Sequence, residues 1–171
     1  MKPILAIFIL GSLTAIAGEA ALRDQPLPDI KATVKIPSDW ESKKESDEEG
    51  IIVYRLSRAA AQGGAEQPSM TLSITPKVPE RTGQTPEAYV TALLDEGATL
   101  VKGEINGLQS IRSEYDIDLD SGKIHSVNVA LANPKTGTLY FFAWQSPVNE
   151  PVEYEAVREK ILTSARFDPA L

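Results

Sequence analysis

The segment "TLYFFAWQS", from Thr138 to Ser146, is the most apolar strand-forming stretch of the sequence. Successive side chains of a strand point to opposite faces of a sheet. This segment carries two apolar sets, Tyr140, Phe142 and Trp144 on one face and Leu139, Phe141 and Ala143 on the other. A strand that is apolar on both faces needs cover on both. We therefore expect a central strand, in a sheet with a layer of structure above and below it.

Other strand patterns surround this segment. Strands are predicted in "IKATVKIPSDW" (30–40), "IIVYRLSR" (51–58), "MTLSITP" (70–76), "TLVKGEI" (99–105) and the stretches 108–119 and 123–132. An Asn106-Gly107 turn separates two of them. Leu108 and Ile111 are three residues apart, so they cannot share a face on a regular strand. A bulge is therefore expected near Gln109 and Ser110.

Two helices complete the pattern. Thr85 is a natural N-cap and Pro86 suits the first turn of a helix that ends near Gly97. Its apolar stripe is predicted to be Tyr89, Val90, Leu93 and Leu94. A second helix is expected from about Glu150 to Ser164, with Phe167 returning to the core. The buried side of this second helix is predicted to be Tyr154, Val157, Ile161 and Leu162. The fold class is therefore α+β, an α/β/α sandwich with a central, mainly antiparallel β-sheet flanked by helices.

The first residues read as an export signal. Lys2 precedes the apolar run Ile4 to Ala17, which is short for a membrane span and ends in an A-x-A site. We expect a signal peptide over 1–20, cleaved after Ala17 or Ala20; the alternative is an uncleaved anchor. Residues 21–29 are interpreted as a linker because Pro26 and Pro28 oppose regular pairing. A single globular domain is predicted over 30–171.

Composition limits the partners and the compartment. The 171 residues carry a net charge of −7, which argues against nucleic acid and anionic lipid as partners. The sequence has no cysteine, which excludes disulfides, thiol catalysis and a lipid attached to cysteine. We expect a soluble, exported protein, periplasmic or secreted, that is not a lipoprotein and has no stable membrane insertion after signal cleavage.

The stretch "YDIDLDSGK", from Tyr115 to Lys123, has an aspartate at every second position. A calcium loop of the EF-hand type needs a glycine at position 6 and a glutamate at position 12. Counted from Asp116, those positions hold Ser121 and Val127, so a weak cation site is the lesser reading. A hairpin with a three-residue loop, 120–122, is preferred, and it sets Leu119 opposite Lys123. The aspartates then belong to a solvated strand face.

This register also places His125, the only histidine, opposite Ile117 on the inner face near the hairpin tip. A hydrolytic triad needs a positioned serine and acid beside the histidine, and the sequence lacks the G-x-S-x-G elbow. A partly buried histidine with a hydrogen-bond partner is the preferred interpretation. No catalytic residue, metal ligand or cofactor-binding residue is predicted.

Two surfaces are candidates for binding. The first is a partner-contact surface at an acidic hairpin tip and a small, polar loop, namely Glu45, Asp47, Glu48, Glu49, Gln62, Gly63 and Gly64. The second is a ligand pocket formed by Trp40, Trp144 and His125. The alternative interpretations are a solvated charge run and ordinary core aromatics.

Several short signatures stand out along the chain, namely "IKATVKIPSDW", "MTLSITP" before "TPEAYVTALL", "NGLQSIRSEYDI", and "GTLYFFAWQSP" before a helix ending "ILTSARF". Together they resemble the PsbP family of photosystem extrinsic proteins. The same fold occurs in Ran-binding nuclear transport factors and in DcrB-like bacterial exported proteins. The resemblance implies an α/β/α sandwich and an accessory or binding role, and no functional residue is carried over from it.

These patterns together favour an exported, non-enzymatic binding or assembly protein that acts through protein contacts. The partner is expected to be a protein, and the expected state of the chain is a monomer without a cofactor. The alternative is a periplasmic protein that binds a small ligand or a divalent cation.

Overall fold

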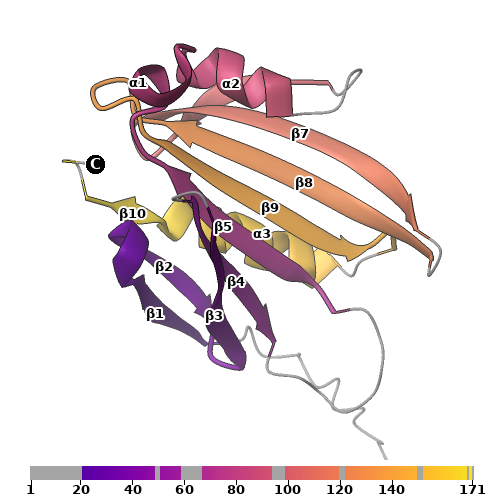
Figure 1. Cartoon of the computed structure of the whole chain (residues 1–171). Coiled ribbons are helices and arrows are strands. Elements are labelled where there is room, and N and C mark those ends of the chain that lie inside the picture. The colour runs from indigo at the N-terminus through magenta and orange to yellow at the C-terminus, as the bar shows by residue number, and fades with distance from the viewer. Residues whose placement is uncertain are drawn as a thin grey trace, which may run out of the picture.

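The computed structural model describes residues 21–48, 51–58, 67–93, 99–119, 122–149, 152–168 and 170. The predicted signal peptide and the predicted helix end at Gly97 lie outside them. Seven strands form one antiparallel sheet in the order β3-β4-β5-β9-β8-β7-β6 (Figure 1). These strands are β3 (Trp40–Glu48), β4 (Ile51–Arg58), β5 (Ser69–Thr75), β6 (Val101–Ile105), β7 (Leu108–Leu119), β8 (Gly122–Ala132) and β9 (Leu139–Pro147).

A second, three-stranded sheet lies against the first. Its order is β1-β2-β10, and its strands are β1 (Leu22–Leu27), β2 (Ala32–Pro37) and β10 (Arg166–Phe167). The helices are α1 (Val78–Thr82), α2 (Pro86–Leu93) and α3 (Val152–Ser164), with a short 3₁₀ turn at Pro28–Ile30. Among the described residues, no helix has the length and apolar character needed to cross a membrane.

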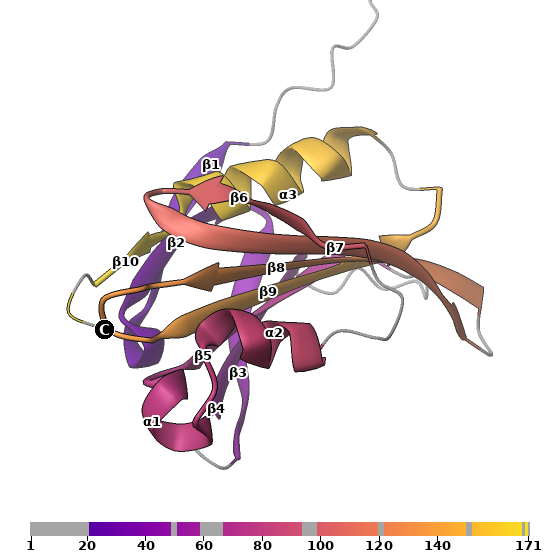
Figure 2. The same cartoon turned by 90° about the horizontal axis from the view of Figure 1, so that it is seen from above.

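The large sheet is covered on both faces. Helix α3 and the small sheet lie on one side of it, and α1 and α2 lie on the other (Figure 2). Strand β9 lies between β5 and β8 at the centre of the large sheet. Its two faces pack into two separate apolar clusters. The predicted α+β class, the helix layers and the central strand are therefore confirmed. The small sheet adds a strand layer beside α3 that the sequence patterns did not indicate.

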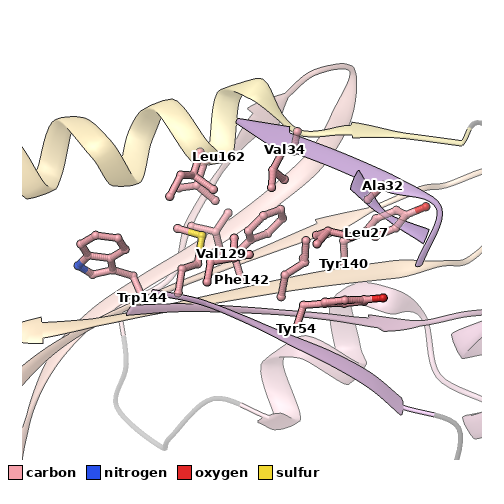
Figure 3. Packing of buried hydrophobic residues seen from close by; sticks show 14 of the residues in the cluster. Leu27, Ala32, Val34, Tyr54, Val129, Tyr140, Phe142, Trp144 and Leu162 are labelled. Carbon is pink, nitrogen blue, oxygen red and sulfur yellow. The ribbon is translucent and has the colours of Figure 1, made fainter. Parts of the chain in front are cut away.

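The larger cluster fills the space between the large sheet and α3 with the small sheet. Figure 3 shows Phe142 and Trp144 on β9 facing Leu162 of α3 and Val34 of β2. Phe167 of β10 stacks on Tyr140, with ring centroids 3.8 Å apart, so its predicted return to the core is confirmed. The smaller cluster, which includes Val78, Val90 and Ile111, lies under α1 and α2.

The predicted start of α2 is confirmed, and the predicted buried sides of α2 and α3 are confirmed in part. Thr85 caps α2, because its Oγ1 accepts a hydrogen bond from the backbone N–H of Ala88 at 3.2 Å. Val90 is buried as predicted, but Leu93 is 54% exposed and does not belong to the apolar face. In α3, Ile161 and Leu162 are buried as predicted.

The interpretation of residues 21–29 as a linker is wrong. Residues Leu22–Leu27 form β1, which pairs with β2 along its whole length and sets Pro26 opposite Thr33. Leu27 is fully buried. Proline is tolerated here because β1 is the edge of the small sheet, where a missing N–H removes no ladder bond. The composition of this segment indicated a break, whereas its edge position permits a strand.

The three-residue loop predicted between β7 and β8 is also wrong. Leu119 pairs with Gly122, so only residues 120 and 121, which lie outside the description, separate the two strands. Glu114 therefore stands opposite Val127, whereas the three-residue loop would have set it opposite Asn128. The predicted loop assumed one apolar face for this hairpin. Since the sheet is covered on both faces, each strand supplies apolar side chains to both clusters.

The predicted bulge near Gln109 and Ser110 does not exist, because both residues pair regularly with β8. Leu108 and Ile111 do face opposite sides, and each packs against a different apolar cluster. The register shift in this sheet instead lies between Lys44 and Ser46 on edge strand β3. Bulges are common at sheet edges, where they increase local twist.

Candidate functional site

The aspartates of β7 lie on a solvated surface. Asp116 and Asp118 are exposed, and each faces a basic residue on β8. The Oδ1 atom of Asp116 is 3.0 Å from Nδ1 of His125, and that of Asp118 is 3.3 Å from Nζ of Lys123. In the part of the chain that the structure describes, no three or more His, Cys, Asp or Glu side chains gather to hold a metal ion. The solvated strand face is confirmed for these two aspartates; Asp120 lies outside the description.

His125 lies between an acid and a serine. It pairs with Asp116 on β7 and with Ser146 on β9, so the three residues form a row across adjacent strands. A hydrolytic triad needs such residues joined by hydrogen bonds, with the serine open to substrate. The Ser146 hydroxyl is buried and has no hydrogen-bond partner among the described residues. The row therefore lacks a connected and accessible nucleophile. Sequence reasoning missed the row because it arises only from the pairing of three strands.

Trp40 and Trp144 are core residues. Their rings are stacked, with centroids 5.9 Å apart and an angle of 12° between the planes. Trp40 is 3% exposed and Trp144 is fully buried, so the stack ties edge strand β3 to central strand β9. Neither tryptophan nor His125 lines the large groove described below. The structure thus places two members of the predicted ligand pocket within packed core.

The predicted partner-contact surface is only partly described. Glu45 is exposed and its Oε1 atom accepts a hydrogen bond from Nε of Arg55 at 2.6 Å. Asp47 and Glu48 belong to the β3–β4 hairpin through their backbones, which confirms that hairpin. The remaining predicted members, Glu49, Gln62, Gly63 and Gly64, lie outside the described residues. This surface stays a prediction.

A groove of about 1070 Å³ lies at the end of the large sheet where β10 crosses it. Its walls are the β6–β7 turn, the β8–β9 turn, the last turn of α3 and β10, which meet at the left in Figure 2. It is lined by residues 106–108, 133–135 and 163–168, with Leu22, Lys35, Tyr140 and Lys160. Six separate segments thus converge on one hollow.

Tyr140 lines this groove from central strand β9. Its ring is fully buried under Phe167, and its hydroxyl has no hydrogen-bond partner among the described residues. Burial, together with the negative charge of Asp168, raises the pKa of Tyr140 to about 12. The hydroxyl therefore stays protonated at neutral pH and is a hydrogen-bond donor that has no acceptor among the described residues. Tyr54 differs, because its hydroxyl bonds to the Asp29 carboxylate.

The charged residues that line the groove are mainly basic. Among the described lining residues, the basic ones are Lys35, Lys135, Lys160 and Arg166, and the one acid is Asp168. Arg166 also forms an ion pair with Asp24, because its Nη2 atom lies 3.2 Å from Oδ1 of that residue. This balance is opposite to that of the chain, whose net charge is −7. The groove is thus a basic region in an acidic protein.

The walls are held together by side-chain hydrogen bonds. Asn106 adopts a left-handed conformation, with φ of 53°, in the predicted Asn106-Gly107 turn. Its Nδ2 atom donates to the backbone oxygens of Thr163 at 3.0 Å and Ala165 at 2.8 Å. These bonds join the β6–β7 turn to the end of α3. Ser164 joins α3 to β2 by accepting a hydrogen bond from the backbone N–H of Lys35 at 2.8 Å.

Sequence reasoning missed the groove. Its basic residues are scattered singly along the chain, and only folding brings them together. The turn at Asn106-Gly107 and the return of Phe167 were both predicted, and they are the two local signals that marked its walls. Tyr140 was placed correctly on one face with Phe142 and Trp144, but no sequence pattern shows that its hydroxyl lacks a partner among the described residues.

No protein-family model and no curated protein matches the sequence. Solved structures do match the fold. A protein from Bacteroides thetaiotaomicron VPI-5482 aligns with a TM-score of 0.59 and 11% identity, over 88% of this chain and 49% of that chain. The present chain thus spans about half the length of that protein.

Two further structures align over most of both chains. The cyanobacterial PsbP protein CyanoP, from Synechocystis sp. PCC 6803, gives a TM-score of 0.55 at 12% identity and covers 93% of this chain and 99% of that chain. LpqN of Mycobacterium tuberculosis, described as involved in cell envelope biogenesis, gives 0.56 at 12% identity, over 84% and 90%. Identities this low show the fold alone. The chain therefore has the PsbP-like fold that its short signatures resemble.

Proposed function

Because the chain has the PsbP-like fold and a basic groove at one end of its sheet, we propose that it is an exported accessory protein that acts by binding. The groove is its binding site, and the partner is a protein. The observation that carries this proposal is the Tyr140 hydroxyl, which is buried at the groove without a hydrogen-bond partner among the described residues. A buried donor without an acceptor destabilises a fold, so a ligand that accepts a hydrogen bond from this hydroxyl would offset that cost.

Export is supported by the N-terminal pattern. Residues 1–20 have the charged start, the apolar run and the A-x-A site of a signal peptide. Expression of the full chain in a bacterial host tests this: mass spectrometry of the periplasmic fraction is expected to show a chain beginning after Ala17 or Ala20. A full-length chain that stays in the membrane fraction supports the uncleaved anchor instead.

The dimensions of the groove suit an extended segment of a partner. Small-molecule pockets typically enclose about 300–1,000 Å³ and bury most of the ligand. This groove is slightly larger, at about 1070 Å³, and is bounded by turns and a helix end at the molecular surface. A segment of another protein can lie along such a surface. A small ligand is the second candidate, because about 1070 Å³ lies close to the upper end of that range.

A blocked groove provides the test. Thr163 is exposed, lines the groove and donates from Oγ1 to the carbonyl of Glu159 at 2.7 Å. Thr91 is its match outside the groove, since it is exposed on α2 and donates to the carbonyl of Glu87 at 2.9 Å. In a crosslinking pull-down from envelope extract, wild type and Thr91→Trp are expected to recover the same specific proteins, which Thr163→Trp loses. Equal recovery by all three forms, or no specific recovery, overturns the proposal.

A further inference from the structure

The groove combines two features that together narrow the chemistry of its occupant. One is the hydroxyl of Tyr140, a buried donor that the protein itself leaves without a partner among the described residues. The other is the excess of basic over acidic residues in the lining. A hydroxyl donor needs an oxygen acceptor, and basic side chains need negative charge. An occupant that meets both demands carries a neutral acceptor and carboxylates a short distance apart.

The negative charge of Asp168 indicates which part of the occupant lies beside Tyr140, the neutral acceptor or a carboxylate. Asp168 acts on Tyr140 electrostatically and helps to raise its pKa, so a second negative charge next to the hydroxyl is disfavoured. A neutral carbonyl is the better acceptor there. The amide N–H groups that accompany carbonyls in a peptide are suitable donors for the carboxylate of Asp168. Backbone amides thus fit the Tyr140 end of the groove better than a phosphate or a free carboxylate does.

Negative charge is better placed farther from Tyr140. Lys35 on β2 and Lys135 in the β8–β9 turn are exposed and form no ion pair among the described residues. Arg166 is exposed on β10 and shares Asp24. These residues come from three different segments, so positive charge is spread along the groove. Several acidic side chains on one extended chain can reach positive charges distributed in this way.

We infer that the groove binds an acidic, extended segment of a partner protein, with a backbone carbonyl of that segment at the Tyr140 hydroxyl and its carboxylates at the basic residues. This inference rests on the proposed function and adds the chemistry of the partner. The chain's own net charge of −7 disfavours the binding of acidic partners elsewhere on its surface. An acidic partner is therefore directed to the basic groove.

The probe is a blocked peptide of alternating glutamate and alanine, labelled for fluorescence anisotropy. Lysine–alanine and glutamine–alanine peptides of equal length are its matched controls. The acidic peptide is expected to bind more tightly than both, and its affinity should fall as salt rises from about 50 mM to about 500 mM. Binding of the glutamine–alanine peptide with equal affinity overturns the inference. Competition by inorganic phosphate as effective as that by unlabelled peptide also overturns it, because it shows a simple anion site.

Variants test each part of the inference. Lys135→Glu and Arg166→Glu are each expected to lower the affinity about twofold to fivefold. Lys43→Glu makes the same charge change on exposed edge strand β3 and is expected to leave the affinity unchanged. Tyr140→Phe should lower it about threefold to tenfold by removing one hydrogen bond. Equal weakening by Lys43→Glu, or no weakening by Tyr140→Phe in a folded protein, overturns the inference.

The two proposals fail separately. If Thr163→Trp loses the recovered proteins but the acidic peptide does not bind, the groove remains the binding site and its acidic preference is wrong. If Thr163→Trp recovers the same proteins as wild type, the groove is not the binding site and both proposals fail. A melting curve for each variant confirms folding; if Tyr140→Phe does not fold, the Arg166 and Lys43 variants still decide the matter.

Discussion

Asp116 and His125 face each other across β7 and β8, with Oδ1 of the acid 3.0 Å from Nδ1 of the imidazole. This contact follows directly from the register of the hairpin. A three-residue loop would have set Asp116 opposite Ser126 and removed the pair. The two side chains are 41% and 27% exposed, so the contact adds little stability and serves as a marker of how the strands are paired.

Engineered cysteines test this register, because the natural chain has none. Ile117 pairs with Ile124, so the double variant Ile117→Cys, Ile124→Cys is expected to form a disulfide on mild oxidation. The matched variant Ile117→Cys, His125→Cys represents the three-residue loop and should oxidise much more slowly. Thiol titration and peptide mass mapping measure both. The opposite order of rates would restore the loop of three residues.

Trp40 is predicted to be essential for stability. Its stack with Trp144 fixes edge strand β3 on the core, so Trp40→Ala should lower the free energy of unfolding by about 3–5 kcal/mol. Val101, which is 59% exposed on β6, provides the control, and Val101→Ala should change stability by less than about 0.5 kcal/mol. Denaturant unfolding measures both variants. A loss below about 1 kcal/mol for Trp40→Ala contradicts a packed aromatic pair.

Tyr140 should make stability depend on alkaline pH. Its pKa is raised from 10.0 to about 12 in the folded protein, so the unfolded chain releases this proton first as pH rises. Stability from this group is fully present below pH 10 and is lost between about pH 10 and 12, by on the order of 2–3 kcal/mol. Unfolding of wild type and Tyr140→Phe across this range isolates the effect, because other groups titrate in both. Parallel curves would show that the hydroxyl is not buried in solution.

The same substitution should be tolerated at neutral pH. Tyr140→Phe removes a buried hydroxyl without a partner among the described residues, so its stability is expected to equal or exceed that of wild type. Tyr54→Phe is the contrast, because it removes a hydrogen bond to Asp29 and should destabilise by about 1–2 kcal/mol. Melting temperatures at pH 7 compare the two. A large loss for Tyr140→Phe would show that the hydroxyl has a partner in the free protein.

Residues 21–29 are predicted to belong to the folded domain. A chain that begins at residue 30 lacks β1, which exposes one edge of β2 and removes the buried Leu27. It should be less stable than a chain that begins at residue 21 by at least about 3 kcal/mol. Leu27→Ala in the longer chain should account for about 2–5 kcal/mol alone. Equal stability of the long and short chains would restore the interpretation as a linker.

Local patterns in the sequence determined much of the fold. The two apolar faces of residues 138–146 indicated a covered central strand, and the Thr85 cap marked the start of α2. Asn106-Gly107 marked a turn. Each of these signals lies within a few residues of the chain, because strand alternation, helix capping and turn conformation depend on immediate neighbours.

Pairing between distant segments was decided by the tertiary structure. Pro26 is tolerated because β1 became an edge, and Glu114 can oppose Val127 because both faces of the sheet are covered. Arg158 is another example. It is only 3% exposed on α3, where Glu155 and Glu159 lie 3.5 Å and 3.2 Å from its guanidinium, so a charged residue occupies a buried position.

Most of the candidate site belongs to this second kind, because only the Asn106-Gly107 turn and the return of Phe167 were predicted. The sequence by itself determined the two apolar faces of the central strand, the start of α2 and the Asn106-Gly107 turn. The tertiary structure alone brought six segments together around Tyr140 and concentrated basic residues in an acidic chain. The physical reason is that the residues packed around a hydroxyl decide whether it is shielded from water and whether it has a hydrogen-bond partner. Those neighbours come from parts of the chain that no local pattern connects.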